Sequence, residues 1–330
     1  MDSLSQLVLG AACTAACVPA AHRRAGLLVG AAMGTLPDLD IIPLSLLDLN
    51  PVEIMTWHRA ASHSLFLIPI VGWLLWFALR RWWQPVREAP RAWLAGIQLA
   101  LVTHPLLDAT TIYGTQLLWP LRPSPVMTGS LFIIDPVYTL PLLVACIVAA
   151  FNRSRRAVVI GLALSTAYIG WSLAAQAHVH RIAERDLASL GLSDAPRFAT
   201  PTPFNTLLWR VVALTPGGYV EGYRSLVADQ KPIQFRAYTN DTAAFAAVTD
   251  FPAVRELRWF NRGFMKSEQR DGRLILSDLR MGSEPDYSFR FAIAEKTPAG
   301  AWTPITPAAA EWPSATNRLT GIWTRLWNEP

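Results

Sequence analysis

Apolar residues form long runs in the first half of the chain and short alternating stretches in the second half. A helix needs about 20 predominantly apolar residues to cross the hydrocarbon core of a bilayer. Four runs approach that length with few or no charges, and two weaker runs near the N-terminus are rich in small residues. We therefore predict a bundle of membrane helices. The four longer runs are residues 64–79, 92–107, 131–151 and 157–177, and the two weaker ones are 4–21 and 25–36.

The pattern changes from about residue 196, where apolar and polar residues alternate over short stretches, as they do in half-buried strands. Two pairs of these stretches flank Thr-Pro-Gly-Gly and Arg-Asp-Gly, which are hairpin signals. The predicted fold class is an α-helical membrane bundle, residues 1–177, followed by a small, water-exposed α+β domain with an antiparallel sheet, residues 178–330. The predicted strands are 206–214, 219–226, 232–239, 265–268, 273–276 and 287–294, and a helix with one apolar face is predicted at 317–327.

Arginines gather in the loops between the apolar runs, and they orient the chain in the membrane. Short loops rich in Lys and Arg stay on the cytoplasmic side. Threading the runs between these loops puts residues 37–63, residues 103–130 and the chain after 178 on the outer face. We therefore expect a multi-pass membrane protein with its C-terminal domain on the outer (periplasmic) side. The arginine-bearing loops are 22–24, 80–91 and 153–156.

Composition supports a membrane location and argues against nucleic acid as a partner. The chain is 52% hydrophobic with 14 Trp, and loop arginines account for its net charge of +5. The sequence contains no basic stripe with interleaved aromatic residues, so the expected partner is the lipid bilayer and not nucleic acid. All three cysteines lie in the apolar runs, which leaves the C-terminal domain without a disulfide framework.

Asp and His are scarce in the apolar half of the chain, yet they gather in three short motifs. They read Pro-Asp-Leu-Asp at 37–40, His-Arg-Ala-Ala-Ser-His-Ser at 58–64 and Thr-His-Pro-Leu-Leu-Asp at 103–108. Only eight acidic residues occur in 1–176; three of them, and three of the six histidines of the chain, lie in these motifs. Carboxylates and imidazoles are ligands of zinc and similar divalent ions. The predicted metal ligands are Asp38, Asp40, His58, His63, His104 and Asp108.

Each motif also has a plainer interpretation. His104 and Asp108 are four residues apart on one helix face and could pair with each other to hold two helices together. Asp38 and Asp40 could begin an ordinary loop, and Asp135, which precedes a proline, could cap a helix. An ionisable residue in a membrane segment is usually functional, however. Because the three motifs fall on one predicted face and share one ligand chemistry, we favour a metal site.

The motifs resemble those of a known family, the YdjM-like, LexA-binding, inner-membrane-associated metal-dependent hydrolases. The resemblance covers residues 1–150 and implies an inner-membrane location and metal-dependent hydrolysis. One departure is Ala-Ala-Ser where many members have Arg-Gly-x-Thr, which affects the turn before His63. The helical His-x-x-x-Asp motif is also similar, more distantly, to zinc-dependent phospholipases of the C type. The elements that carry the family resemblance are Asp38 with Asp40, the run 58–64, and His104 with Asp108.

The residue types permit a defined chemistry. Six ligands exceed the three protein ligands usual for one catalytic zinc, so we expect either two ions or one ion with a general base. The expected cofactor is a divalent metal, with Zn²⁺ favoured, that activates water to attack an ester. A site at the level of the lipid headgroups meets lipids first, so the expected substrate is amphiphilic or lipid-like, with a phosphodiester favoured.

The expected catalytic residues are Asp40, His58 and Arg59. The guanidinium of Arg59 suits a phosphate group, although a headgroup contact or a helix-end ion pair is an equal alternative. Ser62, Ser64 and Thr103 could orient the imidazoles.

Two other functions fit the same residues. A non-catalytic membrane protein would use a closed metal site for stability and its C-terminal domain to bind a partner. An ion or proton pathway would need charged residues deep in several membrane helices. The apolar runs hold almost none, so we rank transport last.

Overall fold

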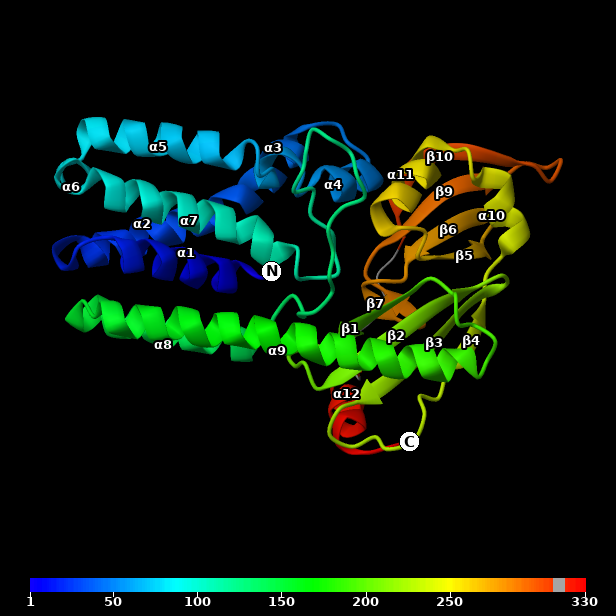
Figure 1. Cartoon of the computed structure of the whole chain (residues 1–330). Helices are drawn as coiled ribbons and strands as arrows, with labels where there is room; N and C mark the ends of the chain where they lie inside the picture. Colours follow the sequence, from blue (N-terminus) through cyan, green and yellow to red (C-terminus); the bar gives the residue numbers. More distant parts are fainter. Residues whose placement is uncertain (311–317) are drawn as a thin grey trace. The chain divides into compact units, whose positions relative to one another are not determined.

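The computed structural model describes residues 1–310 and 318–330, which form two compact units (Figure 1). The first unit is Met1–Pro43 with His58–Leu173, and the second is Leu44–Trp57 with Ala174–Pro330. The predicted domain boundary after residue 177 falls inside the 34-residue helix α9 (Arg155–Ala188).

The first unit is a bundle of helices that run alongside one another (Figure 1). A long loop between α7 and α8 contains one isolated β-bridge, between Thr115 and Val126. The elements are α1 (Ser3–Cys17), η1 (Ala20–His22), α2 (Arg23–Thr35), η2 (Leu36–Asp40), η3 (Ala61–His63), α5 (Ile68–Trp82), α6 (Gln84–Glu88), α7 (Pro90–Asp108), α8 (Pro136–Asn152) and the first part of α9; α3 (Ile41–Leu46) begins in this unit and ends in the second.

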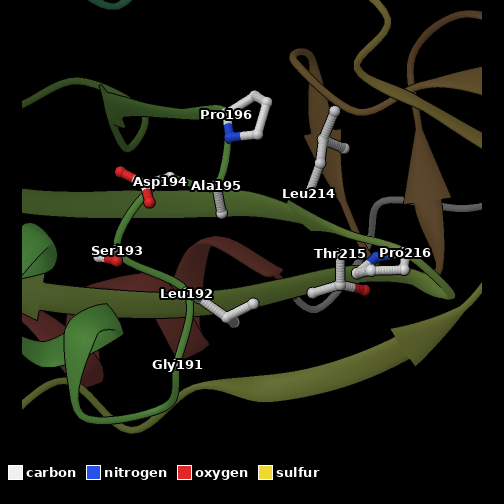
Figure 2. A pocket seen from close by; sticks show the side chains of 9 residues that line it. All are labelled: Gly191, Leu192, Ser193, Asp194, Ala195, Pro196, Leu214, Thr215 and Pro216. Atoms are coloured by element: carbon white, nitrogen blue, oxygen red, sulfur yellow. The ribbon is translucent and has the colours of Figure 1, made fainter.

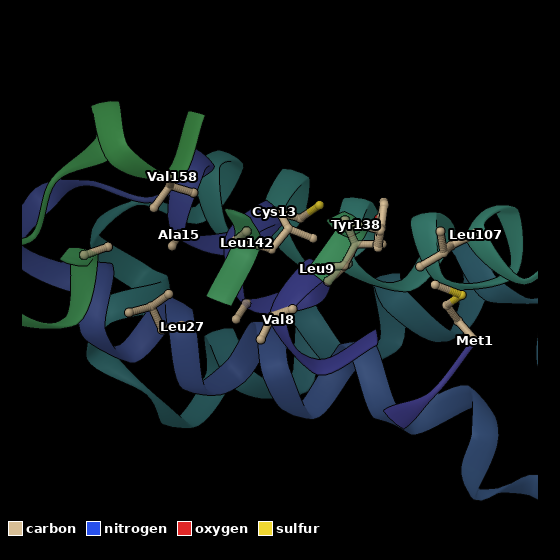
Figure 3. Close-up of a cluster of buried hydrophobic side chains, with 14 of the residues drawn as sticks. Met1, Val8, Leu9, Cys13, Ala15, Leu27, Leu107, Tyr138, Leu142 and Val158 are labelled. Carbon is tan, nitrogen blue, oxygen red and sulfur yellow. The ribbon is translucent and has the colours of Figure 1, made fainter. Parts of the chain in front are cut away.

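Helices α1 and α2 pack with their backbones in contact. A β-carbon added to Gly30 would lie 2.2 Å from the carbonyl oxygen of Gly10, and one added to Gly34 would lie 2.4 Å from that of Gln6. Only glycine permits so close an approach, which is a common device of membrane helices. A buried apolar cluster then joins α1 to α2, α7 and α8 (Figure 3). Its members include Val8, Leu9, Leu27, Leu107, Tyr138 and Leu142.

The arginines at one end of the bundle serve as helix caps. Arg23 donates to the carbonyl groups of Ala15 and Val18, at 3.0 and 3.1 Å. Arg24 donates to Ala150 and Phe151 near the end of α8, at 2.6 and 3.0 Å. Cations at helix C-termini satisfy free carbonyl groups and the helix dipole. These two arginines therefore stabilise the bundle by pairing with carbonyl groups at the ends of α1 and α8.

Two helical stretches, Ala20–Leu46 and Arg155–Ala188, are long and apolar enough to cross a bilayer, and the pair Pro51–His63 and Ile68–Trp82 adds a third if it is one bent span. The weak run at 25–36 thus becomes part of a 27-residue stretch. The helical path continues past residue 36 because Pro37 lies in the first turn of η2, where a missing backbone N–H is tolerated.

The helix formed by the apolar run at 131–151 is shorter than predicted. It begins only at Pro136, because the Asp135 carboxylate accepts the backbone N–H groups of Val137 and Tyr138 and so caps α8. The resulting helix has 17 residues, fewer than the roughly 20 that a full span requires.

The second unit contains the sheets. One four-stranded sheet has the order β1-β2-β3-β4 and another has the order β10-β9-β6-β5, with a two-stranded pair β7-β8, and every pairing is antiparallel. The predicted helical bundle followed by an antiparallel α+β region is confirmed. The elements are α4 (Pro51–Trp57), β1 (Arg197–Pro201), β2 (Leu208–Thr215), β3 (Gly218–Ser225), β4 (Arg236–Thr239), α10 (Thr242–Val248), α11 (Pro252–Asn261), β5 (Met265–Arg270), β6 (Arg273–Asp278), β7 (Gly282–Ser283), β8 (Asp286–Tyr287), β9 (Arg290–Lys296), β10 (Trp302–Ala309) and α12 (Arg318–Trp327).

Both predicted hairpins are present. The β5–β6 turn uses Asp271 and Gly272 at φ of 50° and 73°, the left-handed conformation that a two-residue hairpin turn needs. Strands β1 and β10 were not predicted, because prolines occur in both. Each lies at the edge of its sheet, where a missing N–H is tolerated. The predicted tail helix forms as α12 from Arg318, and residue 317 lies outside the described residues.

Candidate metal centre

Three segments of the first unit bring the ionisable residues together. Asp38 and Asp40 lie in the 3-10 helix η2, which continues directly from α2. In a helix with three residues per turn, positions two apart point in different directions. The two carboxylates therefore meet different partners: Asp38 faces two imidazoles, and Asp40 faces the turn around η3.

The last turn of α7 supplies His104 and Asp108, which share one helix face as their spacing predicts. The helix continues through Pro105, and both side chains are fully buried. The 3-10 turn η3 supplies His63, also fully buried.

Four of the six predicted ligands converge. The Nε2 atom of His63 lies 3.1 Å from Nε2 of His104, 3.1 Å from Oδ2 of Asp108 and 3.4 Å from Oδ1 of Asp38. The Nε2 atom of His104 lies 3.4 Å from the same Asp38 oxygen and 3.5 Å from the same Asp108 oxygen. A tetrahedral ion with bonds of about 2.0–2.1 Å has ligand atoms about 3.3–3.4 Å apart. The observed spacing therefore fits one small cation.

Hydrogen bonding on the far side of each ring assigns its protons. Nδ1 of His104 lies 2.6 Å from the carbonyl oxygen of Gly34, so it must donate. The Ser62 hydroxyl donates to Oδ2 of Asp40 at 2.6 Å and lies 2.9 Å from Nδ1 of His63. Since that hydroxyl proton is already used, Nδ1 of His63 must donate as well. When each ring is neutral, its Nε2 atom is therefore unprotonated and carries a free lone pair.

The acceptor atoms of this group suit a positive charge at its centre. Two carboxylate oxygens and two unprotonated ring nitrogens face one another, and all four are acceptors. Among the described residues, no group donates a hydrogen bond to the buried Oδ1 of Asp38. These residues could hold a metal ion. The side chain of Asp38 is 23% exposed and the other three are 0% exposed.

Asp108 also meets three positive or donating groups. Gln6 donates to its Oδ1 at 2.9 Å, and the Met1 ammonium group contacts the same oxygen. Arg59 Nε lies 3.2 Å from Oδ2. Gln6 was not predicted as part of the site, although a lone amide in the apolar run at 4–21 was an available signal.

Asp40 and His58 lie outside the group of four and bond to each other. Nδ1 of His58 lies 2.7 Å from Oδ1 of Asp40. The other oxygen of Asp40 accepts the backbone N–H of Arg59 at 3.0 Å and the Ser62 hydroxyl. Asp40 therefore organises the turn that carries His58, Arg59 and His63.

Comparison with known protein families identifies the family of the chain. The family model described as YdjM inner membrane protein matches residues 1–179, just over half of the chain. The chain belongs to the YdjM inner membrane protein family. The predicted family is thereby confirmed, and the matched region contains all three motifs of the chain. Searches of curated proteins and of solved structures found no match.

A concave feature lies in the other unit (Figure 2). This hollow of about 360 Å³ is formed by the loop 191–196 and the β2–β3 turn. Its polar side chains are Ser193, Asp194 and Thr215, and none of its nine lining residues is His, Cys, Lys or Arg. It offers neither a metal-binding set nor a base with an oriented partner, so the buried group in the first unit is the better candidate site.

Proposed function

We propose that this YdjM-family chain is an integral inner-membrane, metal-dependent hydrolase whose ion is held by Asp38, His63, His104 and Asp108. The proposal rests on four acceptor atoms that face one another, five of whose separations are 3.1–3.5 Å. Two imidazoles and two carboxylates at this spacing match the usual ligands of Zn²⁺. Because the four atoms surround one point, one ion is proposed in place of two.

When held by these four residues, a divalent ion would supply Lewis-acid chemistry that activates water for attack on an ester. Overall, water adds across the ester bond and yields an alcohol and an acid. His58 is the proposed general base, because Asp40 fixes its ring through Nδ1 and leaves Nε2 to take a proton. Its side chain is 20% exposed, which lets the ring exchange that proton with water. Arg59 is the third proposed catalytic residue.

The proposed substrate is an amphiphilic or lipid ester, with a phosphodiester favoured, met at the outer face of a multi-pass protein. The positions of the arginines support this orientation. In α1, the end near Met1 contacts the candidate site, while carbonyls at the other end accept hydrogen bonds from Arg23. Arginine-rich ends stay in the cytoplasm, so the ligand group belongs on the periplasmic side.

Elemental analysis of the detergent-purified full chain tests the proposal. Wild type is expected to hold about one metal ion per chain, and Asp38→Ala and His104→Ala are expected to lose it. His178→Ala is the control, because that histidine is exposed on α9 and outside the group. Hydrolysis of a chromogenic phosphodiester should follow metal content across the four proteins. A metal-free wild type, or hydrolysis unchanged in His104→Ala, would rule the proposal out.

One observation supports the non-catalytic alternative. Four protein atoms can saturate a tetrahedral ion, as in structural zinc sites, whereas catalytic sites keep a position for water. In that case the C-terminal domain would carry the function by binding a partner. Full metal occupancy with no hydrolysis of any ester, and a lower melting temperature after chelation, would favour this alternative.

A further inference from the structure

Arg59 is a buried cation whose hydrogen-bonding capacity is only partly used. The residue is 4% exposed, and its guanidinium lies over the ring of Tyr113, 5.0 Å from the centroid. Nε lies 3.2 Å from Asp108 Oδ2, but this ion pair is not aligned as a hydrogen bond. Across residues 1–310 and 318–330, no acceptor bonds to Nε or Nη1. Buried polar groups are nearly always hydrogen-bonded, so two such donors mark a place for an acceptor.

The backbone holds this side chain in place at a conformational cost. Arg59 has φ of 64°, a left-handed conformation that a residue with a long side chain rarely adopts. Its N–H donates to Asp40 at 3.0 Å, and its carbonyl accepts from the N–H of Gln116 at 3.0 Å. These two hydrogen bonds fix the backbone N–H and the backbone carbonyl of Arg59. Strained backbone of this kind is concentrated at functional sites, where the surrounding structure maintains it.

Charge gives the chemical class of the missing acceptor. When a divalent ion is bound, the carboxylates of Asp38 and Asp108 balance its charge, so neither is left to balance the guanidinium of Arg59. The Asp40 carboxylate pairs with His58 and accepts from the backbone N–H of Arg59, not from its side chain. A buried charge without a partner is costly and favours binding of an opposite charge. An anion is therefore the expected partner of the Arg59 guanidinium.

We infer that Arg59 and the metal centre together form a receptor for a tetrahedral oxyanion, the phosphate group of the substrate. This inference rests on the proposed function and names its substrate class. A phosphodiester is a monoanion that can balance the charge of Arg59, and its several oxygens can accept from both Nε and Nη1 while also facing the ion. A neutral carboxylic ester carries no charge and would leave the positive charge of Arg59 without an anionic partner.

Calorimetric titration of the zinc-loaded full chain with inorganic phosphate tests this receptor. Wild type is expected to bind phosphate, and Arg59→Gln is expected to bind it roughly 10- to 100-fold more weakly, because a charged donor is lost. Arg59→Lys keeps the charge and is expected to fall between them. Glutamine, lysine and arginine bear the same backbone strain at positive φ, so the three proteins form a matched series. Metal content is measured in each sample.

Arg23→Gln is the control for loss of a buried arginine. Arg23 is 5% exposed and donates to backbone carbonyls at the other end of α1, so its loss should leave phosphate affinity unchanged. If zinc-loaded wild type binds no phosphate, or Arg59→Gln binds as well as wild type, the inference is overturned while the metal site stands. If wild type holds no zinc, the proposed function fails and this inference fails with it.

A second arm identifies the source of the phosphate group. A short-chain phospholipid, dihexanoylphosphatidylcholine, is added below its micellar concentration to protein holding inorganic phosphate. Displacement supports the receptor with a lipid phosphodiester as its ligand. Binding of inorganic phosphate without displacement supports the receptor with free phosphate as its ligand.

Discussion

The hydroxyl oxygen of Ser62 lies 2.9 Å from Nδ1 of His63. The same hydroxyl donates to Asp40 at 2.6 Å, so it can only accept from the ring. The lone pair of His63 Nε2 is therefore directed at the proposed ion. Partners on the far side of a metal-binding imidazole fix its tautomer and orientation and increase its basicity. Ser62 is thus a positioning residue for the metal centre.

Ser62→Ala is expected to weaken zinc binding by about 10- to 100-fold, since loss of such a partner typically has that effect. Ser62→Thr retains the hydroxyl and should bind zinc nearly as wild type does. Competition with a chelator of known affinity measures both. Imidazole ¹⁵N chemical shifts should show His63 as a single tautomer in wild type and as a mixture in Ser62→Ala. Equal zinc affinity in wild type and Ser62→Ala would contradict this role.

Gly30→Ala is expected to lower the melting temperature of the full chain. The added carbon would lie 2.2 Å from a carbonyl oxygen of α1, and overpacking of this kind costs roughly 1–3 kcal/mol. Gly170→Ala in α9 is the matched control, because nothing lies within 4 Å of the added carbon. That change should be neutral or stabilise by up to about 1 kcal/mol, as Gly-to-Ala changes within helices do. Similar melting temperatures for both variants would contradict the close contact of α1 with α2.

Chelation is expected to destabilise wild type. The proposed ion joins η2, η3 and the end of α7, so it binds only the folded bundle. A ligand at a hundredfold excess over its dissociation constant adds about 2.7 kcal/mol to stability. His104→Ala should melt at one temperature with or without chelator. A wild type whose melting does not respond to chelator would contradict metal binding at this group.

Glu268 in the second unit should make stability depend on pH below neutrality. Burial alone would raise the pKa of its carboxyl, but Lys266 at 3.0 Å and Arg290 at 2.6 Å hold that pKa below its usual value. A lowered folded-state pKa contributes stability above the unfolded value of about 4.3 and loses it as the pH falls through the folded value. The contribution is about 1 kcal/mol or less, since the side chain is partly exposed.

Thermal melting of wild type and Glu268→Gln between pH 7 and pH 3 measures this effect. Wild type should be the more stable at pH 7, and the difference should shrink as the pH falls below about 4. A difference that persists unchanged at pH 3 would show that charge on Glu268 is not its cause.

Local spacing was sufficient to predict part of the site. His104 and Asp108 lie four residues apart in an apolar run, and a helix must place them on one face. The hairpins followed from turn chemistry in the same way, because Asp271-Gly272 suits a two-residue turn. In both cases the structure agrees with the prediction.

The remaining features depend on tertiary contacts that local sequence does not determine. Asp38 and Asp40 are two residues apart, and only the 3-10 conformation of η2 sends them to different partners. The carbonyl of Gly34 orients His104, yet every residue has a carbonyl, so the sequence carried no signal for it. Asp135 caps α8, the role that its place before a proline suggested.

Of the four residues around the proposed ion, Asp38 alone reaches the surface of the unit. The residues that follow it, Leu39, Ile41 and Ile42, are 48%, 43% and 54% exposed. Exposed aliphatic side chains therefore adjoin the one carboxylate of the group that is accessible to solvent. Under the proposed function, the hydrocarbon tail of an amphiphilic ester would pack on these side chains while its polar head lies beside Asp38. A fully hydrated substrate would gain no such apolar contact, so these three residues would favour amphiphiles at the binding step.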